Sequence, residues 1–222
     1  MRVADTVILD PRPGVANDIR ARILARAKGN RVLNVGAAGG VTRYLPAHRD
    51  QWLHAAIAEV ASEAVGIDVD AEGIAHAAQH GFELRHADCQ ALDWPDRFDL
   101  IVMSDVIEHL DRPAEAVCAL ARHLAPQGEL WITTPNAGYL GNTVAALRRR
   151  APGVYWDHVA CYLPEHIQAL CDRHGLRLAE VAFFSFIDQR SAGLRLKSSL
   201  VRALAAMAPR LHNSFLAVIR AR

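Results

Sequence analysis

The chain has 222 residues, of which 51% are hydrophobic, and a formal net charge of +1 at pH 7. This length favours one decorated domain with a single sizeable core over two independent domains. Arg or Pro interrupts the longest apolar stretches well before the roughly 18 to 20 residues that a membrane span needs, and the acidic, proline-containing start is unlike a signal peptide. The composition therefore excludes an integral membrane protein, and we expect a cytoplasmic one. Four cysteines without CxxC spacing are expected to be reduced thiols.

Short aliphatic runs alternate with longer helical patterns along the chain, and this alternation predicts an α/β fold with a parallel sheet. The predicted strands are residues 31–35, 64–67, 82–86, 98–103 and 129–133, and residues 178–186 and 214–219 are expected to complete the sheet. The predicted helices are residues 15–27, 47–61, 113–124, 164–174 and 194–207. The third of these helices is expected to stop before Pro126 and Gly128, because both residues continue a helix poorly.

Charge is distributed unevenly along the chain. Residues 1–138 contain 13 Lys or Arg against 19 Asp or Glu, whereas residues 139–222 contain 12 against 5. The part from Arg190 to the end has seven basic residues and no acidic one. Two interpretations of this part stay open: a solvated basic face, or a surface for a phosphorylated, nucleic-acid or membrane partner.

A glycine-rich turn follows the first predicted strand, in the stretch Val-Leu-Asn-Val-Gly-Ala-Ala-Gly-Gly of residues 32–40. Small residues at this point let the backbone turn sharply and approach a ligand, as in nucleotide-type sites. A dinucleotide fingerprint G-x-G-x-x-G that started at Gly36 would need glycine at Ala38 and Val41. The sequence therefore argues against a nicotinamide cofactor, although an ordinary tight turn stays an alternative.

The same turn resembles motif I of the class I methyltransferases that use S-adenosylmethionine (SAM), D/E-x-G-x-G-x-G, with matches at Gly36 and Gly40. Asn34 and Ala38 depart from the motif. Later segments resemble the same family in the correct order: Gly-Ile-Asp at 66–68, the FDxVxxS-like residues 98–104, and the LxPGG-like residues 124–128. The resemblance covers residues 31–136. It implies a Rossmann-like, doubly wound, mostly parallel seven-stranded sheet with helices on both faces.

This resemblance divides the chain into three parts and implies a set of cofactor contacts. Residues 1–30 would form an N-terminal helical cap, residues 31–136 the cofactor-binding core, and residues 137–222 the acceptor-side elements with the last two strands. Asp68 ends the second strand and suits the ribose hydroxyls of SAM, although it lies 32 residues beyond Gly36 where about 20 is usual. In this family an acidic residue at the position of Asp88 commonly meets the adenine amino group. The expected cofactor residues are Gly36, Ala37, Ala38, Gly40, Asp68, Val69, Asp88, Cys89 and Ser104.

Three side chains that can ligate a metal follow the fourth predicted strand. Asp105, Glu108 and His109 are spaced i, i+3 and i+4, which would place them on one face of a helix. Two carboxylates and an imidazole match the ligand set of a divalent cation with open positions. The alternative is that the Glu-His pair only caps or orients the helix, as in many methyltransferases that use no metal.

Two later segments extend this pattern: Thr-Thr-Pro-Asn at residues 133–136 and the pair Asp157 and His158. Together with the acidic and histidine residues they resemble the small-RNA 3′-terminal 2′-O-methyltransferases, and the ubiquinone O-methyltransferases share the first three ligands. The resemblance implies that Asp105, Glu108, His109 and His158 hold Mg²⁺ or Mn²⁺, with Asp105 shorter than the usual Glu.

Methyl transfer from a sulfonium requires mainly that the acceptor is held in line with the methyl group. A hydroxyl acceptor also needs a metal or a base, and His109, His158 and Glu108 are the candidate catalytic residues. The sequence therefore favours O-methylation of a small molecule. N-methylation of a small molecule and an inactive SAM-binding partner protein are the alternatives.

The acceptor site is expected between the N-terminal helix, residues 136–157 and the basic C-terminal part. With 6% aromatic residues and no recognisable RNA-binding module, the sequence does not favour a nucleic-acid acceptor. A sugar, a glycan or a secondary metabolite fits better. The predicted helix at residues 194–207 has an apolar stripe that either packs on the core or rests peripherally on a membrane.

Overall fold

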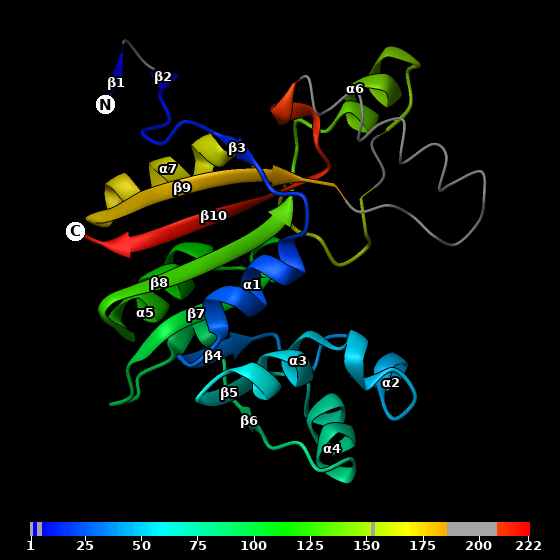
Figure 1. Ribbon diagram of the computed structural model, residues 1–222. Helices are drawn as coiled ribbons and strands as arrows, with labels where there is room; N and C mark the ends of the chain where they lie inside the picture. Colours follow the sequence, from blue (N-terminus) through cyan, green and yellow to red (C-terminus); the bar gives the residue numbers. More distant parts are fainter. Residues whose placement is uncertain (1, 4–5, 152–153, 186–207) are drawn as a thin grey trace.

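The computed structural model describes residues 2–3, 6–151, 154–185 and 208–222. Its centre is an eight-stranded sheet in the order β3-β9-β10-β8-β7-β4-β5-β6, with helices on both faces (Figure 1). A two-stranded sheet, β1 (Arg2–Val3) with β2 (Thr6–Val7), lies before it in the chain. In the part of the chain that the structure describes, no helix has the length and apolarity to cross a membrane.

The sheet has a parallel part and an antiparallel part. The strands β4 (Arg31–Val35), β5 (Glu63–Asp68), β6 (Leu84–His86), β7 (Phe98–Ser104) and β8 (Leu124–Pro135) run parallel. The strand β10 (Ser214–Ala221) pairs antiparallel with both β8 and β9 (Leu176–Phe184). Strand order reverses between β4 and β7, and the carboxyl ends beside such a switch point are where open α/β sheets bind ligands.

Alternate residues of the central strands face two separate cores. Leu33 of β4 and Ile101 of β7 pack into a core with α5 (Pro113–Arg122) and α7 (Pro164–Arg173). Val32 and Leu100 face the other side, where α1 (Ile19–Ala27) and α3 (Leu53–Val60) cover the sheet. Burial on both faces explains why these strands are continuous aliphatic runs in the sequence.

The remaining helical elements lie around the edges of these layers. They are the α-helices α2 (Val41–Tyr44), α4 (Ala71–Gln79) and α6 (Leu140–Leu147) and the 3₁₀ turns η1 (Arg49–Gln51), η2 (Cys89–Ala91), η3 (Ile107–His109) and η4 (Pro209–Leu211).

The α/β class, the doubly wound topology and all seven expected strands are confirmed, but the strand count is eight instead of seven. The additional strand, β3 (Gly14–Val15), lies where the sequence predicted the start of a helix. Helix α1 begins only at Ile19, because the side chain of Asp18 accepts a hydrogen bond from the Ala21 amide at 2.9 Å and so caps the helix there. Gly14 and Val15, which lie a few residues before this cap, are thus free to pair with β9.

The helix predicted over residues 47–61 is interrupted. The backbone is extended at Trp52, between η1 and α3, and the Trp52 indole Nε1 donates a hydrogen bond to the Ala37 carbonyl at 2.9 Å. A tertiary contact therefore sets where α3 begins, which helical periodicity alone does not reveal.

The helix predicted over residues 113–124 ends at Arg122, and Leu124 already belongs to β8. This early start of β8 depends on a bend in which Gln127 has a φ of 67° and a Cβ on Gly128 would lie 2.7 Å from the Phe98 carbonyl oxygen. The helix predicted over residues 194–207 lies outside the described residues.

Candidate active site

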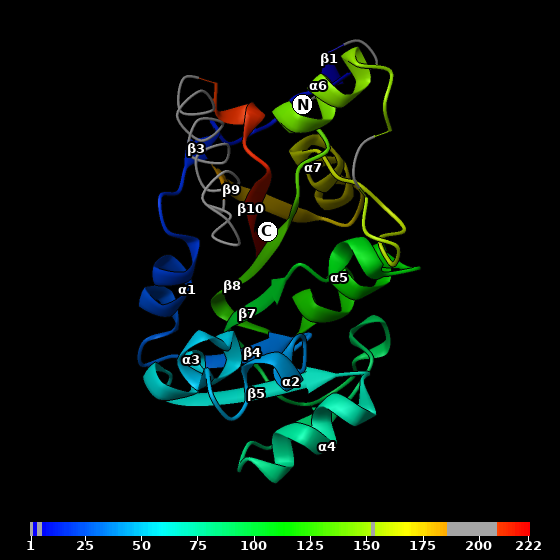
Figure 2. The same ribbon diagram turned by 90° about the vertical axis from the view of Figure 1, so that its right-hand side faces the viewer.

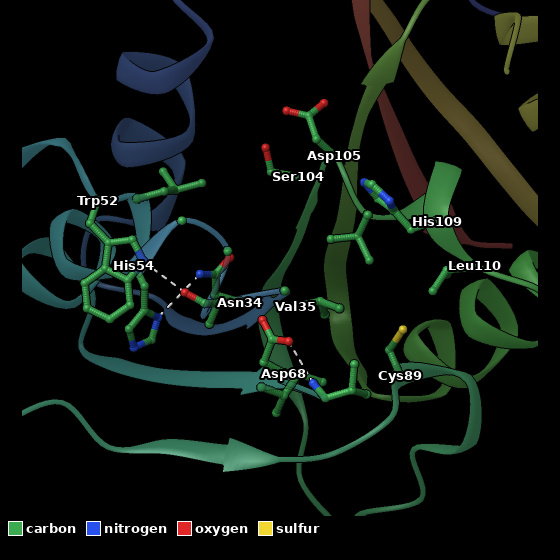
Figure 3. Close-up of a pocket in the computed structure, with 18 of the residues that line it drawn as sticks. Asn34, Val35, Trp52, His54, Asp68, Cys89, Ser104, Asp105, His109 and Leu110 are labelled. Carbon is green, nitrogen blue, oxygen red and sulfur yellow. Dashed lines mark hydrogen bonds between the residues drawn. The ribbon is translucent and has the colours of Figure 1, made fainter. Parts of the chain in front are cut away.

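A cavity of about 1030 Å³ lies at the carboxyl ends of the parallel strands (Figure 3). Its lining contains most of the cofactor residues expected from the sequence, together with Asp105, His109 and Asp157. Ala38, Glu108 and His158 do not line it. The expected cofactor residues in the lining are Gly36, Ala37, Gly40, Asp68, Val69, Asp88, Cys89 and Ser104.

The glycine turn is held tightly against its neighbours. Gly36 has a φ of 72°, and a Cβ at this position would lie 2.5 Å from Cγ2 of Val106. Gly40 has a φ of 68°, in the left-handed region that glycine favours. The backbone of the turn therefore approaches the cavity closely because its residues are small.

Asp68 fixes this turn to the end of β5. Its Oδ2 accepts a hydrogen bond from the Ala38 amide at 2.8 Å, and its Oδ1 accepts from the Val69 and Asp70 amides at 2.8 and 3.0 Å. A carboxylate can accept about four hydrogen bonds, so Asp68 retains capacity for a ligand. Ala38, expected as a cofactor contact, is buried and serves as the partner of Asp68.

Asp88 and Cys89 line the cavity after β6, next to the end of β5. Asp88 Oδ1 accepts from the Gln90 amide at 2.8 Å and so caps η2. Burial raises the pKa of the Cys89 thiol to about 12, which leaves a neutral side chain against the cavity.

Sequence reasoning missed a buried polar group beside the glycine turn, formed by Asn34, Trp52 and His54 (Figure 3). His54 Nδ1 lies 3.4 Å from Asn34 Nδ2, and burial lowers the pKa of His54 to about 4. Gly66 makes room for this imidazole, because a Cβ there would lie 2.7 Å from His54 Cε1. An amide and a neutral imidazole thus occupy the place where the family motif has a carboxylate. In the sequence, only the departure of Asn34 from the family motif indicated that this position is unusual.

The predicted helical face for the metal ligands is wrong. Asp105 has a φ of 52°, and only the 3₁₀ turn η3 follows it. Its backbone amide donates to the Thr133 carbonyl at 3.0 Å, so pairing with β8 holds Asp105 in place before the turn starts. Ser104 Oγ lies 2.8 Å from Thr133 Oγ1, at the same strand ends.

Glu108 points into the protein and is 1% exposed. Its Oε2 accepts a hydrogen bond from Thr134 Oγ1 at 3.0 Å, whereas its Oε1 has no hydrogen-bond partner among the described residues. Burial raises the pKa of Glu108 to about 7. A buried carboxylate oxygen without a partner is costly unless a ligand completes it.

The structure brings His109 and His158 to Glu108. The imidazole rings of the two histidines are 4.7 Å apart, and one potential ligand atom from each of the three residues lies within 4.8 Å of the others. The backbone carbonyl of Glu108 accepts from the Val159 amide at 2.9 Å, which anchors the distant segment. Asp157 Oδ2 lies 3.3 Å from His109 Nδ1. Asp105, the fourth expected ligand, is outside this group.

Comparisons with known proteins agree with this architecture. A family model described as a methyltransferase domain matches residues 11–181. Ubiquinone biosynthesis O-methyltransferases of Aromatoleum aromaticum and Aeromonas salmonicida are 26% and 27% identical to this chain, over 71% and 69% of its length and 68% and 66% of theirs.

Solved structures show the same fold at lower identity. The magnesium protoporphyrin IX methyltransferase of Synechocystis, with SAH bound, has a TM-score of 0.60 at 16% identity and covers 91% of this chain and 80% of its own. The N-methyltransferase NodS of Bradyrhizobium japonicum has a TM-score of 0.55 at 19% identity, and the match covers 91% of this chain and 86% of NodS. Since the family model spans well over half of the sequence, the chain belongs to the class I SAM-dependent methyltransferases.

Proposed function

We propose that the cavity binds SAM and that the chain transfers its methyl group to a hydroxyl of a small molecule. The glycine turn would approach the amino-acid portion of SAM, Asp68 the ribose hydroxyls and Asp88 the adenine. Two arginines that the sequence reasoning did not consider, Arg20 and Arg43, also line the cavity. Either guanidinium suits the carboxylate of SAM.

We further propose that Glu108, His109 and His158 hold a divalent cation, Mg²⁺ or Mn²⁺, at the edge of the cavity that His109 lines. The observation that carries this proposal is the gathering of three ligand atoms within 4.8 Å, together with the partnerless Oε1 of Glu108. Asp157 beside His109 resembles the outer carboxylates that orient ligating histidines. Asp105, the fourth ligand expected from the sequence, lines the cavity but is outside this cluster.

A divalent cation lowers the pKa of a hydroxyl that it binds, and this is the chemistry that it would supply here. The residues of the chain do the remaining work. Thr134 fixes the carboxylate of Glu108, and Asp157 fixes the ring of His109, which lines the cavity. The acceptor oxygen forms a bond to the methyl carbon while the carbon–sulfur bond breaks, so SAM leaves as SAH. With a cation bound, the lone pairs of His109 and His158 would serve as ligands, and the hydroxyl proton would pass to water; without a cation, His109 or His158 would take that proton as a base.

The acceptor is proposed to be a hydroxyl compound, preferably a vicinal diol of a sugar, glycan or secondary metabolite. A cation with open positions can hold two neighbouring oxygens. The relatives named O-methyltransferases support oxygen as the acceptor atom.

The test is methyl transfer from SAM to a panel of diols, with and without EDTA, followed by addition of Mn²⁺. We expect EDTA to abolish transfer and Mn²⁺ to restore it. His158→Ala should lose activity, whereas His174→Ala, an exposed histidine at the end of α7, should not. Full activity in EDTA would reject the metal, and an active His158→Ala would reject that residue's role.

A further inference from the structure

Helix α6 exposes apolar side chains that a surface helix normally buries. None of its eight residues is buried. Val144 is 36% exposed and Leu147 is 80% exposed. Helices of globular proteins usually pack their apolar stripe on the core.

The segment after α6 continues this exposure. Val154, Tyr155, Trp156 and Val159 are 52%, 71%, 95% and 63% exposed. Tryptophan is rarely so exposed in a globular protein, because burying its large apolar ring stabilises the fold. Neighbouring apolar residues that are all exposed indicate a contact surface.

Positive charge accompanies these apolar residues. Arg148, Arg149 and Arg150 are all exposed between the helix and the aromatic pair. The sequence has no Asp or Glu from residue 139 to residue 156. The next residue, Asp157, is an acid that lies 3.3 Å from His109 Nδ1. The combination of Trp, Tyr, aliphatic residues and Arg is the one that proteins use at the interface of an anionic membrane.

The position of this segment relates it to the cavity. Helix α6 lies beyond the arrowhead of β8 (Figures 1 and 2), and the cavity is lined by residues at the same carboxyl ends of the parallel strands. Asp157, which follows Trp156 directly, lines the cavity. A flat partner on this side would therefore meet the apolar residues next to the mouth of the cavity.

We propose that this docking surface, defined as Val144, Leu147, the arginines 148–150, Val154, Tyr155, Trp156 and Val159, binds an anionic lipid bilayer. The rings of Tyr155 and Trp156 enter the headgroup region, and the arginines pair with lipid phosphates. Docking brings the cavity to the membrane surface. The inference does not depend on methyl transfer, since binding to lipid requires neither SAM nor acceptor.

The test uses the full chain with vesicles of phosphatidylcholine alone and with equal parts of phosphatidylcholine and phosphatidylglycerol. We expect cosedimentation with the anionic vesicles only. Trp156 supplies its own reporter, because its fluorescence should shift to the blue on binding and Trp156→Phe should remove that shift. Of the other three tryptophans, Trp52 and Trp131 are buried and Trp94 is half-buried, and none belongs to this surface, so they should contribute a constant background.

Variants then test the two parts of the surface. Replacing the arginines 148–150 with Gln should weaken partition into anionic vesicles by about 100-fold, and Trp156→Ala by about tenfold. The matched control replaces Arg97, Arg177 and Arg222 with Gln. These exposed arginines lie in a second cavity near the carboxyl terminus, at the opposite end of the sheet. Replacing them lowers the net charge by the same amount as replacing the arginines 148–150, and the partition coefficient should stay within about threefold of the wild-type value.

Four outcomes would overturn the proposal. They are the absence of binding to either vesicle, equal binding to both vesicles, an equal loss in the control variant, and binding without a change in Trp156 emission. The last result would indicate a purely electrostatic contact, as with a soluble polyanion or an acidic protein. A chain that binds lipid but transfers no methyl group would separate this inference from the proposed function.

Discussion

On the β4 and β5 side of the cavity, polar groups bind one another. Asp68 accepts three backbone amides, and Trp52 donates to the carbonyl of Ala37. On the β7 and β8 side, Glu108 keeps a buried oxygen without a partner in the described part of the chain, and two imidazoles face it within ligand distance. Both sides lie at the carboxyl ends of the same sheet, but only the first is complete in itself.

This difference indicates that the two sides bind their ligands in different ways. On the β4 and β5 side the backbone is already held in place by its own hydrogen bonds, so it can bind the cofactor with little reorganisation. An incomplete cluster of acidic and imidazole groups gains stability when a cation arrives, so ligand binding and local stability are coupled there. Substitutions on the two sides should therefore affect different measurements.

Asp68→Ala should have the largest effect. The change removes the acceptor of three amides as well as the proposed ribose contact, and hydrogen bonds to a charged group contribute about 1.5 to 3 kcal/mol each. We expect SAH affinity, measured by calorimetry, to fall by about 1000-fold. Asp70→Ala is the control: it removes only the cap of α4, outside the cavity lining, and should retain binding. If Asp68→Ala and Asp70→Ala lost similar amounts of SAH affinity, the proposed role of Asp68 in holding the glycine turn and the ribose would be rejected.

The neutral His54 predicts how stability depends on pH on the cofactor side. Burial lowers its pKa from 6.5 to about 4, so the unfolded chain binds a proton at a higher pH than the folded chain does. Its contribution to stability is therefore complete above pH 6.5 and is lost as pH falls toward 4, by about 3 kcal/mol in total.

The measurement is the free energy of unfolding in urea at pH 7.5 and pH 5, for the wild type and for His54→Gln. We expect the wild type to lose more stability on acidification than the variant does. Parallel pH profiles would show that His54 is not the buried neutral group that the structure indicates.

The sequence predicted the parallel strands well because each is an aliphatic run buried on both faces, a local pattern. It failed where a distant contact sets an element. The start of α3 depends on the bond from Trp52 to the Ala37 carbonyl, and β3 exists because Gly14 and Val15 reach β9, which comes much later in the chain. Neither partner can be inferred from periodicity.

The same limit applies to the site. Asp68 and Gly36 follow strands directly, so topology alone places them together. His158 reaches Glu108 through a hydrogen bond from the Val159 amide, which no spacing encodes, and its place in the cluster was inferred only from family resemblance. The spacing of Asp105, Glu108 and His109 led to a wrong prediction of a shared helical face. Asp105 pairs with Thr133 of β8, so the 3₁₀ turn η3 begins only after it.

Glu108→Gln tests the incomplete side. The amide cannot replace a charged ligand, so Mn²⁺ affinity, followed by the electron paramagnetic resonance of the free ion, should fall by about 100-fold at pH 8. In the wild type, affinity should rise by about tenfold between pH 6 and pH 8, because Glu108, with a pKa of about 7, must lose its proton to ligate. A wild type and a variant with the same affinity and pH profile would exclude Glu108 as a ligand.

Thr134→Val is the mildest change, and it asks whether the orientation of Glu108 matters apart from its charge. Valine preserves shape but removes the hydroxyl that donates to Glu108 Oε2 at 3.0 Å, and this hydrogen bond also helps to lower the pKa of Glu108. Without it, the carboxylate is harder to ionise and freer to turn, so Mn²⁺ affinity at pH 7 should fall by about tenfold. Thr143→Val, an exposed position in α6, is the matched control.

SAH affinity should not change in either variant, because the cofactor side keeps all of its hydrogen bonds. A loss of SAH binding in Thr134→Val would mean that the two sides of the cavity are coupled.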